Sequence, residues 1–239
     1  MKPHSLVFTR LTTLLLSVAG CVYLSGCRAD PAPDAGFVTD PSLMTKEDDL
    51  PFDAVWLKPG VDLRGFKSVY IAPIDTTHLL KQDWWDKVNF APGDQQKEAQ
   101  ILANYFHERL TDAFQADDRK VYQVVDQPQH DSLIIELAIV EVVPTKIWLN
   151  IIGYAALAGL SEGTTAFEGR LRDGKNQELI GEMKDREFGQ MSLVNISDFS
   201  WCRHSEHTIK IWSSDLVKMC YRTPGKAISS MATFTLRPW

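Results

Sequence analysis

The sequence predicts an α+β domain, an α/β sandwich in which a mixed sheet of about five strands is packed by two long helices. Three observations lead to this fold. Five short runs are rich in β-branched and aromatic residues, two longer segments carry apolar residues every three or four positions, and Asp173-Gly174 is a hairpin signal. The chain has 239 residues, of which 44% are hydrophobic and 23% charged, and this composition excludes a disordered or collagen-like protein.

Five segments have the composition of strands. They are residues 67–75, 121–125, 131–143, 164–172 and 178–188. The third run is almost continuously apolar, which is typical of a central strand covered on both faces. The fourth alternates, with Phe167 on one face and Glu168 on the other, and Asp173-Gly174 joins it to the fifth as a hairpin.

Two helices are expected, at residues 94–115 and 198–221. Asp94 is suited to cap the first helix, in which apolar residues recur three and four positions apart. In the second helix, Trp212 and Leu216 lie on one apolar stripe, and Pro224-Gly225 ends it. Each helix therefore presents one apolar face for packing against the sheet.

The N-terminus has the layout of an export signal. Lys2 and Arg10 precede an uncharged run over residues 11–26, which is slightly short for a bilayer span. Leu24-Ser25-Gly26-Cys27 is similar to the bacterial lipoprotein box, in which a peptidase cleaves before a cysteine that carries diacylglycerol. The sequence therefore predicts lipid attachment at Cys27, with Cys21 as the alternative.

Three regions follow from this leader. We expect a lipoprotein signal peptide at 1–26, a lipidated N-terminus and flexible tether at 27–53, and one periplasmic α/β domain at 54–239. Prolines and aspartates dominate the start of the tether. Its remainder is polar, and we expect partial order at most, with Phe37 and Leu43 as the residues that could strap it to the domain.

Arg28 follows Cys27 in place of the aspartate that favours inner-membrane retention, which indicates the outer membrane.

The cysteines and histidines near the second helix can each be interpreted in two ways. Cys202 and Cys220 could pair in an oxidising compartment, but on one helix they would lie about 27 Å apart. We therefore expect them to be reduced and packed. Cys202, His204 and His207 are spaced like metal ligands, yet zinc needs further ligands that the nearby sequence lacks. We therefore expect these three residues to lie on a solvated helix face and to bind neither a metal nor a cofactor.

Residues 147–160 are the most apolar stretch after the signal peptide. At 14 residues they are too short to span a bilayer. They could form a buried helix or an exposed apolar patch for a partner or a membrane surface, and we favour a core or interface role. The partner contacts expected there are Trp148, Ile151, Tyr154 and Leu157.

Two further groups suggest surface features. Glu168, Asp185 and Arg186 are expected to form a ladder of surface charges across the hairpin. A catalytic dyad would need a pocket and shifted pKa values. Trp84-Trp85 lies in a polar loop and could serve a sugar-stacking or partner site, or close the core.

Several motifs, in order, point to one family. They are Gly36-Phe37, Leu57-Lys58-Pro59-Gly60-Val61-Asp62, Val69-Tyr70-Ile71-Ala72-Pro73, Tyr105-Phe106, Tyr122-Gln123-Val124-Val125-Asp126, Arg172-Asp173-Gly174, Asp185-Arg186 and the segment from Trp201 to Trp212. With the lipoprotein box, they make the chain similar to an uncharacterised family of bacterial lipoproteins, domain-of-unknown-function family 3313. The resemblance implies an α/β domain akin to small periplasmic lipoprotein domains that serve as assembly accessories.

These patterns lead to one functional hypothesis and two alternatives. We expect an outer-membrane lipoprotein, held to the membrane by its N-terminal lipid. Its periplasmic domain would bind an envelope protein or peptidoglycan as an assembly or secretion accessory. An envelope hydrolase directed at peptidoglycan or lipid, or a carrier of lipid or another small ligand, remains open. No nucleophile elbow, P-loop or dinucleotide fingerprint occurs in the sequence, and the net charge of −6 argues against a general nucleic-acid binder.

Overall fold

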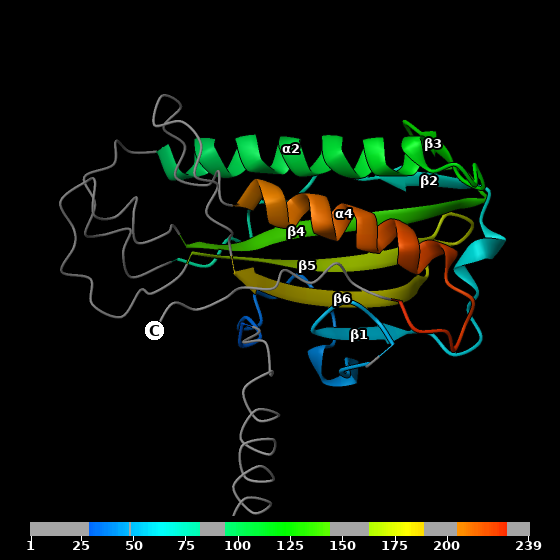
Figure 1. Cartoon of the computed structure of the whole chain (residues 1–239), viewed down its shortest axis with the longest axis horizontal. Coiled ribbons are helices and arrows are strands. Elements are labelled where there is room, and N and C mark those ends of the chain that lie inside the picture. Colours follow the sequence, from blue (N-terminus) through cyan, green and yellow to red (C-terminus); the bar gives the residue numbers. More distant parts are fainter. Residues whose placement is uncertain (1–28, 48, 82–93, 144–162, 189–204, 229–239) are drawn as a thin grey trace, which may run out of the picture. The chain divides into compact units, whose positions relative to one another are not determined.

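A computed structural model describes residues 29–47, 49–81, 94–143, 163–188 and 205–228. Six strands form one sheet (Figure 1). They are β1 (Ala54–Leu57), β2 (Ser68–Ile71), β3 (Gln123–Val125), β4 (Ser132–Val143), β5 (Thr164–Asp173) and β6 (Leu179–Phe188). The two long helices are α2 (Asp94–Ala116) and α4 (Ser205–Tyr221), and short 3-10 turns lie at η1 (Pro41–Leu43) and η2 (Leu63–Gly65).

The sheet is mixed, with the strand order β1-β6-β5-β4-β2-β3. β2 runs parallel to both β3 and β4, whereas β4, β5, β6 and β1 pair antiparallel in succession. The predicted α+β class is thus confirmed. The additional strand is β1, a four-residue strand that forms its ladder with β6 and lies at the edge of the sheet as described.

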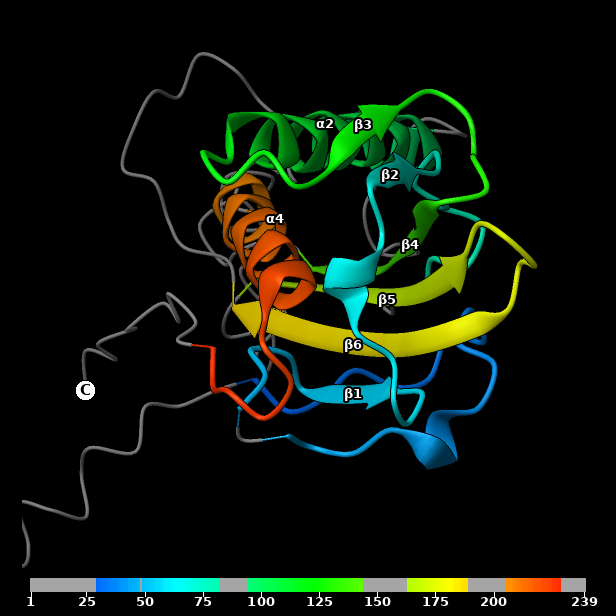
Figure 2. The ribbon, with the colours of Figure 1, turned by 90° about the vertical axis from the view of Figure 1, so that its right-hand side faces the viewer.

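Both helices pack on one face of the sheet (Figure 2). The centre of this layer is Phe167 on β5, whose ring lies 4.7 Å from Trp212 on α4 and 6.0 Å from Phe106 on α2. The ring of Phe52, just before β1, packs on Phe167 from a third side at 5.7 Å. These side chains are at most 1% exposed. Their apolar surface is therefore almost fully removed from water, which is the main favourable term in folding.

The predicted helical stripes are confirmed where the structure describes them. Leu102, Phe106 and Leu110 on α2 are buried, as are Trp212 and Leu216 on α4. α2 ends one residue beyond the expected position, and α4 ends where expected. The start predicted for the second helix, at residue 198, lies outside the described residues. No helix in the described ranges is both long and apolar enough to cross a bilayer.

Strand β4 is covered on both faces, as its apolar run predicts. Ile135, Leu137 and Ile139 belong to the large core beneath the helices. Ala138 and Val140, which point the other way, form a second small cluster with Phe37 and Ala166. The cover on this second face comes from the N-terminal segment, which the sequence led us to expect as a tether.

The described residues of this segment, 29–47 and 49–53, pack on the domain. Phe37, Val38, Leu50 and Phe52 are each at most 6% exposed, and the backbone of Thr45 pairs with that of Val55 in an antiparallel bridge. The packed part of the chain therefore includes Ala29, well before the domain start predicted at residue 54. Phe37 does attach this segment, but Leu43 does not, since it is 49% exposed.

Cys220 is a free, fully buried thiol near the end of α4. Burial raises its pKa to about 12, because an apolar environment disfavours the thiolate. The hydroxyl of Tyr122 donates to the Cys220 carbonyl, 2.9 Å away, and lies 2.8 Å from the Leu63 carbonyl. The packing predicted for Cys220 is confirmed, whereas Cys202, its possible disulfide partner, lies outside the described residues.

Candidate functional site

The most unusual feature of the domain is a segment that crosses the sheet on the face opposite α2 and α4. We call residues 29–40 the strap and this face of the sheet the back face. The strap appears in blue beneath β5 and β6 (Figures 1 and 2). It forms no ladder with a strand. Its backbone is held instead by charged side chains that project from β5 and β6.

Glu168 on β5 receives three backbone hydrogen bonds from the strap. Its two carboxylate oxygens accept from the N–H groups of Ala35, Phe37 and Val38, at 2.7, 2.9 and 2.9 Å. Gly36 has a φ of +83°, a conformation that glycine adopts without steric cost. This turn directs the flanking N–H groups toward one carboxylate, much as successive amides form an anion-binding nest.

Glu182 on β6 holds the next part of the strap. Its carboxylate accepts from the N–H groups of Thr39 and Asp40. Glu168 is 1% exposed and Glu182 0% exposed. A carboxylate removed from water is costly unless hydrogen bonds replace its hydration, and bonds to charged acceptors contribute about 1.5–3 kcal/mol each. The strap and the two glutamates therefore stabilise one another.

Cationic side chains complete the attachment. Lys184 Nζ lies 2.6 Å from Asp34 Oδ1. The guanidinium of Arg186 donates to the Asp30 carbonyl at 3.1 Å and also binds Glu141. The strap thus contacts β6 near its C-terminal end through Arg186 and nearer its middle through Glu182.

The ring of Phe37 is the apolar centre of the strap. The Arg170 guanidinium lies 4.1 Å from its centroid, a cation–π contact, and the His78 ring meets it edge-on at 5.3 Å. His78 Nδ1 lies 3.0 Å from an Asp75 oxygen. Partial burial opposes ionisation of Asp75, but hydrogen bonds from His78 and Thr77 outweigh it and hold the Asp75 pKa below its usual value.

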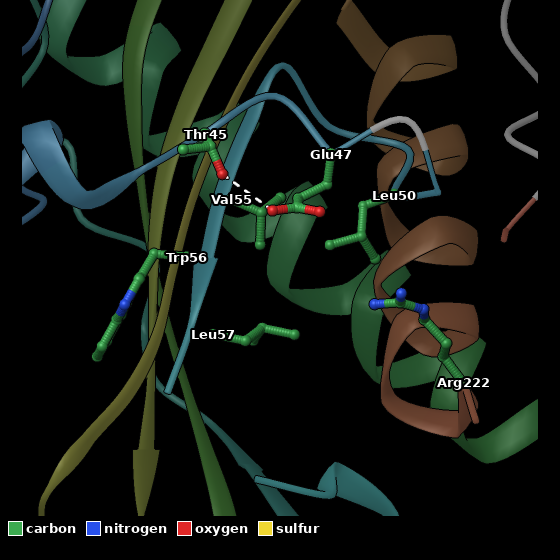
Figure 3. A pocket seen from close by; sticks show the side chains of 7 residues that line it. All are labelled: Thr45, Glu47, Leu50, Val55, Trp56, Leu57 and Arg222. Atoms are coloured by element: carbon green, nitrogen blue, oxygen red, sulfur yellow. Dashed lines mark hydrogen bonds between the residues drawn. The ribbon is translucent and has the colours of Figure 1, made fainter. Parts of the chain in front are cut away.

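A separate small pocket lies at the outer edge of β1 (Figure 3). Its volume is about 230 Å³, and it is lined by Thr45, Glu47, Leu50, Val55, Trp56, Leu57 and Arg222. The Glu47 carboxylate accepts from the Thr45 hydroxyl at 2.9 Å, and Arg222 pairs with Asp49. The pocket is smaller than the roughly 300–1,000 Å³ typical of ligand sites, and its two charged side chains are already paired.

Several residues predicted for function lie outside the described residues. These are the lipid-attachment cysteines Cys27 and Cys21, the partner contacts Trp148, Ile151, Tyr154 and Leu157, and the residues Trp84, Trp85, Cys202 and His204. Of the three residues spaced like metal ligands, only His207 is described, and it is exposed on α4. Within the described ranges, no group of three or more His, Cys, Asp or Glu side chains is placed to hold a metal ion.

The predicted ladder of surface charges is wrong. Glu168 and Asp185 are buried and belong to opposite faces, because Asp185 pairs in register with Phe167. Asp185 accepts from the Trp212 indole N–H at 2.7 Å beneath α4. Glu168 binds the strap, and Arg186 binds Glu141. Each of these three charged side chains therefore binds a partner within the domain.

Sequence reasoning missed Glu182 and the strap backbone as its partners. The alternation along β5 correctly placed Glu168 on the face opposite Phe167, but such a charged face is expected to meet solvent. A sequence signal was present, since Gly36-Phe37 lies among polar residues. This signal could not identify the acceptor carboxylates, which are 130 or more positions away in the sequence.

Comparison with known proteins places this domain in a family. The family model described as Protein of unknown function (DUF3313) matches residues 33–213. A search of curated proteins finds no match. The matched range begins within the strap and includes β1 to β6, α2 and the first half of α4.

Solved structures show more distant likeness. The PelC dodecamer from Paraburkholderia phytofirmans is 12% identical, with 68% of this chain and 94% of that chain covered and a TM-score of 0.37. A Xanthomonas campestris protein of family DUF330 is 10% identical over 67% of this chain and 86% of its own, with a TM-score of 0.41. A DUF4136 family protein from Bacteroides thetaiotaomicron is 10% identical over 70% and 94%, with a TM-score of 0.36. The family match, which spans most of the chain, is the decisive finding, and the protein belongs to the DUF3313 family.

Proposed function

We propose that this protein is a bacterial outer-membrane lipoprotein whose periplasmic domain binds another envelope component as an assembly or secretion accessory. The observation that carries the proposal is the sequence Leu24-Ser25-Gly26-Cys27, which ends two residues before Ala29, a residue already packed on the domain. A lipid on Cys27 would then join a folded domain with almost no intervening chain. Arg28 after the cysteine favours the outer membrane.

Replacing Cys27 by alanine is expected to abolish lipid attachment and to remove the protein from the outer-membrane fraction. The thiol is the atom that forms the thioether, and alanine has none. Metabolic labelling with an alkyne fatty acid, membrane fractionation and mass spectrometry of the N-terminal peptide measure this directly. Cys21→Ala is the matched control and should leave labelling unchanged. A Cys27→Ala protein that still reaches the outer membrane with its lipid would contradict the assignment.

The partner-binding part of the proposal rests on residues 147–160. In sequence this apolar segment lies between Val143 and Thr164, which pair with each other at one end of the sheet. Arg186, which holds the start of the strap, is also close to this end, since β6 finishes at Phe188. The segment therefore connects two residues at the end of the sheet where Arg186 holds the start of the strap.

A photo-crosslinking residue at Ile151 is expected to capture one envelope protein reproducibly. The apolar composition of the segment supports a protein contact. The same residue at Lys175, in the β5–β6 turn, is the control and should give no such product. The products are identified by mass spectrometry from intact cells. Equal labelling from both positions, or none from Ile151, would count against an interface on this segment.

The edge pocket gives no support to the alternative of a hydrolase. It contains one carboxylate, Glu47, which is hydrogen-bonded to Thr45, and one cation, Arg222, which is paired with Asp49. General acid–base catalysis needs a group that can reach a substrate proton. The accessory function is therefore the proposal that we favour.

A further inference from the structure

The strap changes how far the domain can lie from the lipid. If residues 27–53 were a free tether, they would span up to about 90 Å when fully extended. With the strap bound, only Arg28 separates Cys27 from Ala29, so these two residues lie no more than about 7 Å apart. Ala29 is itself 5% exposed and thus already packed on the domain.

We propose that the strap holds the domain directly against the lipid surface, with the bilayer next to Ala29 at the end of the sheet where β4 and β6 finish. This inference rests on the proposed lipidation of Cys27. The partner surface is the bilayer that carries the lipid. Protein partners must then be contacted at that surface, because the domain cannot extend away from it.

The contacts of the strap show which described part of the domain lies nearest to Ala29. Asp30 is held by Arg186, two residues before β6 ends, and Arg186 is held by Glu141, two residues before β4 ends. The later strap residues 37–40 run to Glu168 and Glu182, farther from these strand ends. The hairpin turn at Asp173-Gly174 lies at the other end of the same strands and would point away from the membrane.

The strap is held by many contacts spread along its length, which distinguishes it from a weakly bound surface segment. Five backbone N–H groups bind two carboxylates that are at most 1% exposed. Phe37 is buried against Arg170, and Lys184 and Arg186 add two ionic or charge-assisted contacts. Release of the strap would leave buried carboxylates without these donors, which is a costly state.

Neutron reflectometry of the lipidated, full mature protein tests the proposal. The protein is placed in a supported bilayer of phosphatidylethanolamine and phosphatidylglycerol, and the thickness of the water layer between lipid headgroups and domain is measured. The wild type should show a water layer of no more than about 7 Å. A Glu168→Gln/Glu182→Gln double variant should release residues 27–40, and the layer should then grow to about 20 Å.

Two further variants keep the test decisive. Val38→Pro removes one strap N–H and leaves every sheet residue unchanged, so it should also widen the layer even if the double variant fails to fold. Glu178→Gln is the matched control, because Glu178 pairs with Lys58 at the exposed edge and has no contact with the strap among those described. It should behave as the wild type.

The outcomes separate this inference from the proposed function. An N-terminal peptide without lipid contradicts the proposed function, and the proposal on the strap falls with it. A lipidated wild type with a water layer of about 20 Å or more overturns the strap proposal alone. Equal layers in the wild type and in a folded Val38→Pro protein whose strap amides exchange hydrogen as a released chain would also overturn it, because the strap would then not set the distance.

Discussion

Replacing Trp212 by alanine is expected to lower the free energy of unfolding by about 3–5 kcal/mol. The Trp212 side chain is 1% exposed and packs on Phe167 and Phe106, at 4.7 and 5.9 Å between ring centroids. Alanine would leave a cavity where α2, α4 and the sheet meet. It would also remove the indole N–H that donates to Asp185 at 2.7 Å. Urea denaturation followed by circular dichroism measures the change.

The Trp212→Phe variant separates the contribution of aromatic packing from that of the hydrogen bond to Asp185. Phenylalanine keeps much of the aromatic packing but has no N–H, so the buried Asp185 loses a donor. The expected loss is smaller, about 1–3 kcal/mol. If Trp212→Ala costs less than about 1 kcal/mol, the aromatic cluster is not the centre of the core that its burial indicates.

Gly174→Ala is expected to destabilise the domain by about 1–3 kcal/mol or more. A Cβ at residue 174 would lie 2.1 Å from the Gln129 carbonyl oxygen and 2.7 Å from that of Ser132. Both are backbone atoms, so neither can rotate away as a side chain would. The Gly174 N–H also donates to Ser132 at 2.8 Å, which ties the hairpin turn to the start of β4. Thermal and urea unfolding should both report the loss.

Gly65→Ala is the matched control for this substitution. A Cβ at residue 65 would meet nothing within 4 Å, and the residue does not have a positive φ. Its stability should change by less than about 1 kcal/mol, and a small gain is expected from the reduced freedom of the unfolded chain. Equal effects of the two substitutions would show that the close approach at Gly174 is relieved by a backbone shift.

Most strands and both helices could be predicted because their side-chain patterns are local. The continuous apolar run of β4 and the stripes of α2 and α4 each follow from a single periodicity. β1 could not be predicted in this way. Its four residues, Ala54–Leu57, are too short to show a pattern, and their strand conformation depends on pairing with β6.

The candidate site was less predictable than the fold. The sequence correctly indicated that Phe37 would attach the N-terminal segment, and it placed Glu168 on the face opposite Phe167. It gave no way to see that Glu168 and Glu182 would bind backbone N–H groups of that segment. A backbone N–H is present at every non-proline residue, so the identity of the donors carries no sequence signal.

The sequence by itself determined the fold class, the position of most elements and membership of the DUF3313 family, since apolar periodicity and ordered motifs are properties of the chain alone. Only the tertiary structure decided that residues 29–40 are a strap. A segment rich in proline and aspartate has no apolar face with which to fold alone. It becomes ordered because the back face of the sheet supplies buried carboxylates, cations and a site for Phe37.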